Sequence, residues 1–298
     1  MKTKFKIIIR AAGHSVGKVF CAGAVLLIAA SGQAQNLFVS SWGSQGIDEF
    51  TPDGVRSTFA TGLSWPTGLV FNNAGDLFAT DGTGNIYEYT PDGVRSTFAT
   101  GLQQPIGLAF NSAGNLFVGD ESGNIYEYTP GGVRSTFASG LYYPEGLAFD
   151  SAGNLFVAEP IGIICEIMPG GVQSTFASAS AYFFGLAFNS AGNLFAADLG
   201  GGNIYEYTPD GVQTTFASGL NDSAGLAFNS AGDLFVSGSG GDSIYEITPD
   251  GTQSIFASGV HNSYALAFQP VPEPSASVLL TIGATILFPF VRCKCVTA

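Results

Sequence analysis

The chain has 298 residues, with 23 acidic side chains against 10 basic ones. Between residues 36 and 270 only Arg56, Arg95 and Arg134 are basic, against 22 acids, so this part carries a formal charge of −19. Because binding to phosphates requires Lys and Arg, we predict no nucleic-acid partner. The same range holds one histidine, His261, and one cysteine, Cys165, which excludes a disulfide framework and a zinc site of His and Cys ligands.

Residues 1–34 have the layout of a secretory signal peptide. Basic residues are frequent from Met1 to Lys18, an apolar stretch runs from Val19 to Ala30, and small residues precede Gln35. A membrane-spanning helix usually needs about 20 apolar residues, so this stretch is short for a retained anchor. We therefore predict that signal peptidase removes the segment and that the protein is exported across the inner membrane.

Residues 35–270 consist of repeats of one unit, of which GLAFNSAGNLFV is the most regular part. Successive copies are 39 or 40 residues apart, and the last copy is degenerate. The copies begin at Gly68, Gly107, Gly146, Gly185, Gly225 and Ala265. A period near 40 residues indicates a repeat architecture.

Each repeat contains four short runs rich in Phe, Tyr, Val and Ile, which are residues that favour β-strands. In the first complete repeat these runs are residues 68–71, 76–79, 85–89 and 94–98. Asn-Ala-Gly and Pro-Asp-Gly sequences separate them, and glycine supplies the positive φ that tight hairpins need. Each repeat is therefore predicted to be a four-stranded antiparallel meander, which is the blade of a β-propeller.

The two ends of the repeat region are complementary. The region begins at Asn36-Leu-Phe-Val39 with a second strand that lacks a first, and it ends at Ala265-Leu-Ala-Phe268 with a first strand alone. Together these segments complete one blade. We predict an all-β fold, a six-bladed β-propeller of four-stranded antiparallel blades whose ring is closed by the C-terminal strand joining the N-terminal blade. A short apolar helix is predicted at each terminus.

The repeat resembles those of NHL-repeat propellers and of the related gluconolactonase superfamily. Residues Pro105 to Gly131 carry this likeness, with the pattern P-x-G-L-A-F-x-x-A-G-N-L-F-V-x-D followed by G-N-I-Y-E-Y-T-P-x-G. The resemblance covers residues 35–270 and implies the six-bladed fold. It implies little about function, because propellers host many unrelated activities.

Residues 271–298 hold three ordered features. Pro272-Glu273-Pro274 comes first, an apolar run from Ala276 to Val291 follows, and Arg292 and Lys294 lie near the end. This order resembles the PEP-CTERM sorting signal of exopolysaccharide-producing Gram-negative bacteria. The resemblance implies a transmembrane segment, recognition by an exosortase-type protease, and a destination at the cell envelope, cell surface or secreted matrix. Whether the segment is retained or cleaved stays open.

A meander places alternate loops on opposite faces of the ring. The loops of one face repeat almost unchanged, whereas those of the other face differ from blade to blade and contain both tryptophans. Because a binding site needs local asymmetry, we predict that the variable face binds the ligand. Its candidate residues are Trp42, Trp65, Tyr142, Tyr143, Glu145, Tyr182, Phe183, His261 and Tyr264.

Aromatic rings beside carboxylates suit a polyhydroxylated ligand, which here means a polysaccharide, with a protein ligand as the alternative. The aromatic residues could instead plug the central channel.

A further glutamate recurs in the third strand of every repeat, as Glu49, Glu88, Glu127, Glu166, Glu206 and Glu246. These are predicted to lie toward the outside, too far apart for the ~5–10 Å of paired carboxylate chemistry.

The gluconolactonase resemblance implies an enzymatic alternative that depends on calcium. In that family several metal ligands directly precede the Gly-Leu of the first strand. The matching positions are Thr67, Ile106, Glu145, Phe184, Ala224 and Tyr264. Only Glu145 offers a carboxylate there, whereas calcium takes six to eight oxygen ligands. Weaker candidates are the acids that end the second strands, Asp81, Asp120, Glu159 and Asp198.

We predict no catalytic residues and no resident cofactor or metal, with calcium as the one ion to test. The expected function is a non-catalytic binding or scaffold module, and exopolysaccharide is the expected ligand. The alternative is a calcium-dependent lactonase-like hydrolase or a polysaccharide lyase.

Overall fold

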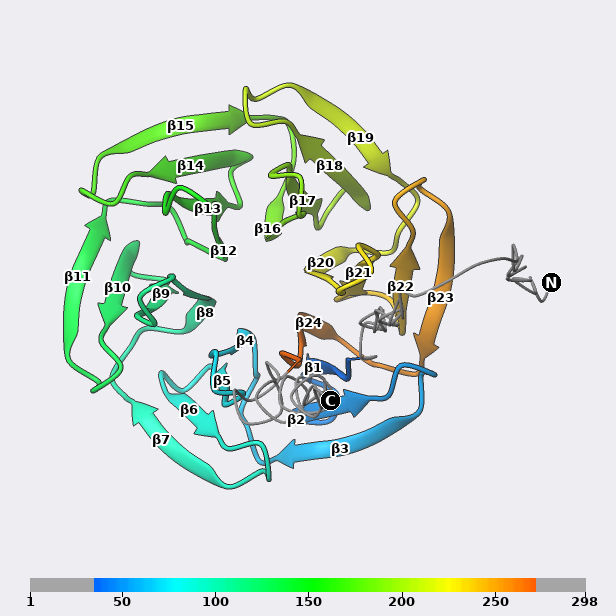
Figure 1. The fold of residues 1–298 in the computed structure, drawn as a ribbon, viewed down its shortest axis with the longest axis horizontal. Helices are drawn as coiled ribbons and strands as arrows, with labels where there is room; N and C mark the ends of the chain where they lie inside the picture. The colour runs from blue at the N-terminus through cyan, green and yellow to red at the C-terminus, as the bar shows by residue number, and fades with distance from the viewer. Residues whose placement is uncertain (1–34, 272–298) are drawn as a thin grey trace, which may run out of the picture. The chain divides into compact units, whose positions relative to one another are not determined.

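The computed structural model describes residues 35–271, in which 24 strands form six separate four-stranded antiparallel sheets. The sheets are arranged around a central axis like the blades of a propeller, with one strand of each next to the centre (Figure 1). The described residues contain no helix. The predicted all-β, six-bladed propeller is therefore confirmed.

In every blade the strands run in the following order from the centre outward. Blade 1 contains β24 (Ser263–Phe268), β1 (Leu37–Ser41), β2 (Gly46–Phe50) and β3 (Arg56–Thr61); blade 2 contains β4 (Leu69–Phe71), β5 (Leu77–Thr80), β6 (Ile86–Tyr89) and β7 (Arg95–Ala99); blade 3 contains β8 (Pro105–Phe110), β9 (Leu116–Asp120), β10 (Asn124–Tyr128) and β11 (Arg134–Ser139). Blade 4 contains β12 (Gly146–Phe149), β13 (Leu155–Glu159), β14 (Ile163–Ile167) and β15 (Gln173–Ser178); blade 5 contains β16 (Phe183–Phe188), β17 (Leu194–Asp198), β18 (Asn203–Tyr207) and β19 (Gln213–Ala217); blade 6 contains β20 (Ser223–Phe228), β21 (Leu234–Gly238), β22 (Ser243–Ile247) and β23 (Gln253–Ser258).

The predicted strands of the first complete repeat differ from β4 to β7 by about one residue at their ends. The predicted terminal helices, the signal peptide and the sorting residues Pro272, Glu273, Pro274 and Arg292 lie outside the described residues. Within residues 35–271 there is no helix with the length and apolar character that a membrane span requires.

Strands from the two ends of the repeat region close the ring in blade 1. β24 pairs antiparallel with β1, so that Leu37 lies opposite Phe268 and Phe38 opposite Ala267. This is the exchange that the incomplete repeats predicted. It gives β1 a hydrogen-bonding partner on both sides and leaves the central ring of six inner strands complete.

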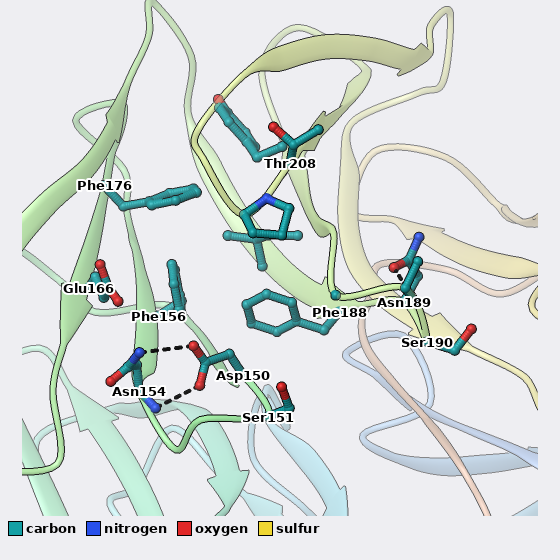
Figure 2. Close-up of a pocket in the computed structure, with 15 residues that line it drawn as sticks. Asp150, Ser151, Asn154, Phe156, Glu166, Phe176, Phe188, Asn189, Ser190 and Thr208 are labelled. Atoms are coloured by element: carbon teal, nitrogen blue, oxygen red, sulfur yellow. Dashed lines mark hydrogen bonds between the residues drawn. The ribbon is translucent and has the colours of Figure 1, made fainter.

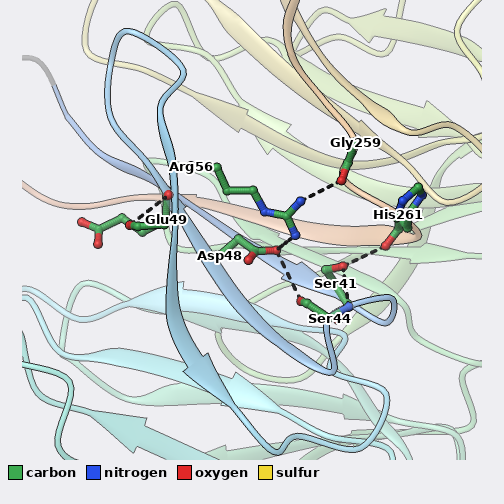
Figure 3. Close-up of polar contacts among 8 residues, drawn as sticks. Ser41, Ser44, Asp48, Glu49, Arg56, Gly259 and His261 are labelled. Atoms are coloured by element: carbon green, nitrogen blue, oxygen red, sulfur yellow. Dashed lines mark hydrogen bonds and ion pairs between the residues drawn. The ribbon is translucent and has the colours of Figure 1, made fainter.

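In the same blade an ion pair holds β2 to β3, and its arginine also bonds the loop that leads into β24 (Figure 3). Arg56 donates to the buried carboxylate of Asp48 over 2.7 Å and, through its other terminal nitrogen, to the carbonyl oxygen of Gly259 over 2.7 Å. The corresponding Arg95 of blade 2 lies instead over the ring of Tyr87, at 5.0 Å from its centroid. Blade 1 is therefore specialised, because it carries an acid where blade 2 has a tyrosine.

Neighbouring blades are joined by a repeated cluster of phenylalanines. In blade 2, Phe78 makes edge-to-face contacts with Phe98 of its own blade and with Phe110 of blade 3, both at 5.1 Å between ring centroids. The same arrangement recurs at the other five interfaces. Such pairs contribute about 0.5–1.5 kcal/mol beyond the burial of their area.

Glycines allow the inner strands to approach closely around the axis. A Cβ atom added at Gly146 would lie 2.1 Å from the carbonyl oxygen of Phe184 in the next blade, and at Gly68 it would lie 2.2 Å from the carbonyl oxygen of Ile106. The channel between these strands is accordingly narrow, with a volume of about 80 Å³. Among the described residues, a larger cavity lies beside this narrow channel, at its mouth.

Candidate functional site

The variable loops enclose a cavity of about 220 Å³ at one mouth of the channel, which we call the mouth cavity. Its floor is built from the residues that directly precede the inner-strand glycines, one from each of five blades. They are Thr67, Ile106, Glu145, Phe184 and Tyr264. Because these positions are equivalent in the repeat but differ in side chain, a symmetric ring gives an asymmetric cavity.

Aromatic rings form one wall of the mouth cavity. Trp42 stacks on Tyr264 with ring centroids 4.2 Å apart, and Trp65 lies 6.4 Å from Trp42. Tyr264 also contacts Phe184 at 5.7 Å. Trp65 is 60% exposed, so this ring stands at the rim and is accessible to a ligand.

Glu145 is the carboxyl group at the floor of the cavity, and it is only 7% exposed. Its Oε1 accepts a hydrogen bond of 2.9 Å from the hydroxyl of Tyr182, whereas its Oε2 has no hydrogen-bond partner among the described residues. Burial raises the pKa of Glu145 to about 7, against the lowering effect of the Tyr182 hydrogen bond. The group can therefore take up or release a proton near neutral pH.

Tyr182 reaches Glu145 because its loop departs from the repeat. Five of the six loops between blades begin with a glycine at positive φ, but this one begins with Ala179. Residues equivalent to Tyr182, such as Trp65 and Gln104, also have positive φ, whereas Tyr182 does not. Alanine disfavours the glycine conformation, so the loop takes a different backbone path. The burial of Tyr182 and the nearby Glu145 raise the pKa of its hydroxyl.

Another part of the cavity lining is polar. Gln104 donates a hydrogen bond of 2.7 Å to Glu121, and both side chains line the cavity. The cavity is lined by no lysine, arginine or histidine among the described residues. It can therefore compensate positive charge on a ligand but not negative charge.

The acids that end the second strands cap the turns that follow them. Asp81 accepts hydrogen bonds from the backbone and hydroxyl of Thr83, and Glu159 accepts one from the backbone of Tyr142. Asp120 and Asp198 likewise accept hydrogen bonds from backbone groups of nearby loops. Burial raises the pKa of Glu159.

These acids do not gather into a calcium site. Within residues 35–271, no three side chains of His, Cys, Asp or Glu converge on a common point. Glu145 and Glu121 supply the only carboxylates of the mouth cavity, fewer oxygens than calcium takes. The residues present do not fit the ion that the gluconolactonase resemblance implied, and we derive no calcium-dependent step.

The structure brings five of the nine predicted face residues together in the mouth cavity: Trp42, Trp65, Glu145, Tyr182 and Tyr264. Tyr142 and Tyr143 are exposed, form an edge-to-face pair at 4.9 Å, and do not line it. Phe183 is fully buried against Tyr205 and Tyr207, so it belongs to the core. His261 is exposed and pairs with Asp242 at 2.7 Å.

Three of the recurrent glutamates of the third strands are held by asparagine side chains. Glu49, Glu127 and Glu206 each accept a hydrogen bond of 2.7 Å from an asparagine that precedes the second strand of the same blade. These hydrogen bonds join neighbouring strands within a blade. Cys165 is buried, and burial raises the pKa of its thiol.

A larger hollow, of about 490 Å³, lies between blades 4 and 5 on the face of the regular loops (Figure 2). Phe156, Phe176 and Phe188 line it together with Glu166, and Asp150 is held by Asn154. An equivalent groove of about 250 Å³ lies between blades 2 and 3. Because the grooves are built from the repeated blade interface, they lack the asymmetry of the mouth cavity.

Several lining residues were absent from the predicted set, notably Gln104, Glu121, Phe184 and Leu199. All four lie in the variable loops or directly before an inner-strand glycine. Their positions in the repeat could have identified these residues. Their residue types could not, since a single glutamine or leucine does not indicate a binding site.

Comparison with protein-family models and with curated proteins finds no match. Solved structures match in fold. A chain of a nidogen/laminin complex has a TM-score of 0.73 and 18% identity, covering 80% of this chain and 100% of that chain. A gluconolactonase from Xanthomonas campestris has a TM-score of 0.63 and 16% identity, covering 78% and 88%. Virginiamycin B lyase from Staphylococcus aureus has a TM-score of 0.61 and 15% identity, covering 77% and 84%. These similarities establish the six-bladed fold, which these enzymes share with a member of a protein complex.

Proposed function

We propose that the protein is an exported binding or scaffold module of the cell envelope or extracellular matrix, and that its mouth cavity binds one sugar unit of an extracellular polysaccharide. The observation that carries this proposal is the asymmetric cavity itself, in which aromatic rings surround one buried carboxyl. A sugar presents an apolar ring face for stacking and hydroxyl groups for hydrogen bonds.

Two buried polar atoms support a hydroxyl-bearing ligand. The indole nitrogen of Trp42 is a donor and Oε2 of Glu145 is an acceptor, and neither has a partner among the described residues. A buried polar group without a partner costs about 1–3 kcal/mol. A hydroxyl group, which both donates and accepts, can satisfy either atom. The volume of about 220 Å³ is small for a ligand site and favours a single ring over a long segment.

The proposed location follows from the ends of the sequence. Residues 1–34 and 271–298 carry the features of a signal peptide and of a PEP-CTERM sorting signal, so signal peptidase and an exosortase-type protease are the proposed processing partners. The C-terminal apolar run would hold the protein in the membrane at least until processing. A matrix or surface role would then place the mouth cavity among extracellular polysaccharides.

Tryptophan fluorescence tests this function directly, because Trp42 and Trp65 are the only tryptophans of the chain and both line the cavity. Titration with saccharides released from extracellular polysaccharide is expected to shift the emission and to saturate. Trp65→Ala is expected to weaken binding at least about tenfold, since an aromatic side chain on which the ligand stacks is commonly a dominant contact of a binding site. Unchanged affinity of the Trp65→Ala protein would overturn the assignment of the cavity.

A second candidate function is proton transfer to or from a bound substrate, as in a lyase or a lactone hydrolase. It is favoured by Glu145, whose pKa of about 7 suits a general base and whose Oε1 is held by Tyr182. The enzymes among the fold neighbours support it as well. The lack of a basic side chain among the described lining residues disfavours an anionic transition state, because no cation would stabilise it.

Steady-state assays separate the two candidates. A lyase acting through Glu145 would generate unsaturated saccharide ends, detected by ultraviolet absorbance, and Glu145→Gln would abolish the product without preventing binding. Turnover of lactones or polysaccharides by the wild-type protein, lost in Glu145→Gln, would establish catalysis. Saturable binding without any product would support the binding module and exclude the enzyme.

A further inference from the structure

The charge of the mouth cavity is one-sided. Glu145 and Glu121 line it, while the three arginines of the described residues are engaged elsewhere. Arg56 binds Asp48 at the ring seam, and Arg95 and Arg134 lie over tyrosine rings of the third strands. The range from residue 36 to residue 270 carries 22 acids against these three arginines, so the surrounding field adds to the local negative charge.

The aromatic wall acts in the same direction. The face of an aromatic ring is electronegative and attracts a cation placed within about 6 Å of the ring centroid. Trp42 and Tyr264 stack on each other with centroids 4.2 Å apart, so the ring most open to a cation is that of Trp65, which is 60% exposed and lies 6.4 Å from Trp42. Tryptophan is the most effective ring for this interaction.

Glu145 supplies the matching acceptor at the floor. Its Oε2 is buried and lacks a partner among the described residues, while Oε1 is already held by Tyr182. A positively charged donor that reached Oε2 would form a charge-assisted hydrogen bond, which is about twice as strong as a neutral one. A protonated amine therefore satisfies the free acceptor atom of Glu145, the rings and the charge at once, whereas a quaternary amine, which has no N–H, satisfies the rings and the charge.

We propose that the mouth cavity selects an organic cation, a ligand that carries a protonated or quaternary amine between the aromatic wall and the two glutamates. In an extracellular polysaccharide this group is the free amine of an amino sugar. The inference rests on the proposed function, because it takes the mouth cavity as the ligand site and narrows the class of ligand.

A pair of small probes tests the charge selection. Choline and 3,3-dimethylbutan-1-ol have nearly the same shape, but only choline is charged. Tryptophan fluorescence is expected to give at least about tenfold tighter binding for choline, the ratio that a desolvated cation–π contact supports. Equal affinities, or tighter binding of the neutral alcohol, would overturn the inference.

Variants connect the selection to the two glutamates. The double variant Glu121→Gln with Glu145→Gln keeps the shape of the cavity and removes its negative charge, so choline affinity is expected to fall about tenfold or more. The double variant Glu88→Gln with Glu166→Gln removes the same two charges from the grooves between blades, outside the mouth cavity, and is expected to leave choline affinity unchanged. Thermal unfolding of each variant shows that it is folded. An unaltered choline affinity in the folded double variant contradicts the inference.

Sugar probes distinguish failure of this inference from failure of the proposed function. Glucosamine, titrated at pH 7, where its amine is largely protonated and Glu145 is partly ionised, is expected to bind at least about tenfold more tightly than N-acetylglucosamine, which is uncharged. Comparable binding of both sugars would contradict the cation selection and keep the saccharide site. Binding of choline without any sugar would keep the cation selection and contradict the saccharide function. Absence of binding by every probe would overturn both.

Discussion

Glu145 shows how one residue of a repeat acquires a distinct role. Its position is occupied by Thr67, Ile106, Phe184, Ala224 and Tyr264 in the other blades, so the backbone was already determined by the repeat. The sequence could identify this carboxylate, because it is the only one at the equivalent positions. It could not identify the hydrogen bond from Tyr182, since that contact depends on the altered path of one loop.

The buried carboxyl of Glu145 makes stability depend on pH. Its folded-state pKa of about 7 lies above the reference value of 4.5, so folding favours the protonated form. The free energy of unfolding should therefore fall, by roughly 3 kcal/mol from this group, as the pH rises from 4.5 to 7. Chemical denaturation at several pH values should show a smaller decrease in Glu145→Gln. Parallel curves for the two proteins would contradict the raised pKa.

Asp48 and Arg56 form a second specialised pair. Asp48 is 1% exposed in its side chain, and Arg56 is 36% exposed. Arg56→Ala would leave the buried carboxylate of Asp48 without its cation and with only the Ser44 hydroxyl, at 3.3 Å, as a donor; removing one partner costs about 3–5 kcal/mol for a fully buried pair. Because Arg56 is partly exposed, we expect a loss of about 2–3 kcal/mol in urea unfolding. Asp48→Asn in the same background should recover part of it, and a loss below 0.5 kcal/mol would refute this account.

The regular turns between strands explain why the sequence predicted the strands of the blades to within about one residue. The turn glycines recur at positive φ, for example Gly93 at 83° and Gly132 at 78°, and they fix where each hairpin reverses. The outer hairpins repeat, so one repeat determines the others. The inner loops vary in sequence, and the residues that line the mouth cavity could therefore be placed only when the whole ring was assembled.

The close approach of the inner strands predicts that a side chain larger than glycine destabilises them. Gly146→Ala would place a Cβ atom 2.1 Å from the carbonyl oxygen of Phe184, which is backbone and cannot move aside freely. We expect a loss of at least about 1–3 kcal/mol, the usual cost of overpacking. Gly170→Ala is the matched control, because no atom lies within 4 Å of the added Cβ and its φ is not positive. Equal thermal stability of the two variants would contradict this reason for the glycine.

Closure of the ring joins the two ends of the repeat region and so concerns the whole propeller. Incomplete repeats at the two ends of residues 35–270 predicted it from sequence alone, since neither end could form a blade without the other. The ion pair between Arg56 and Asp48 could not be predicted, because arginine recurs at the equivalent positions of blades 2 and 3, where the residue that matches Asp48 is a tyrosine.

A truncation that ends at Ser258 would remove β24 and leave β1 without its inner partner. We expect this protein to lose cooperative unfolding and the near-ultraviolet dichroism that arises from Trp42 stacked on Tyr264. A protein that ends at Val271 keeps all 24 strands and serves as the control. An identical unfolding midpoint for both truncations would show that closure contributes little to stability.

The mouth cavity and the blade grooves are two kinds of hollow that the described residues offer to a ligand, and one measurement decides between them. A carbohydrate array can be probed with the wild-type protein, with Trp65→Ala, and with a groove variant that combines Asp150→Asn and Glu166→Gln. The account predicts that wild type and the groove variant bind the same sugars, with amino sugars strongest, and that Trp65→Ala loses them. Retained binding by Trp65→Ala together with loss in the groove variant would contradict it.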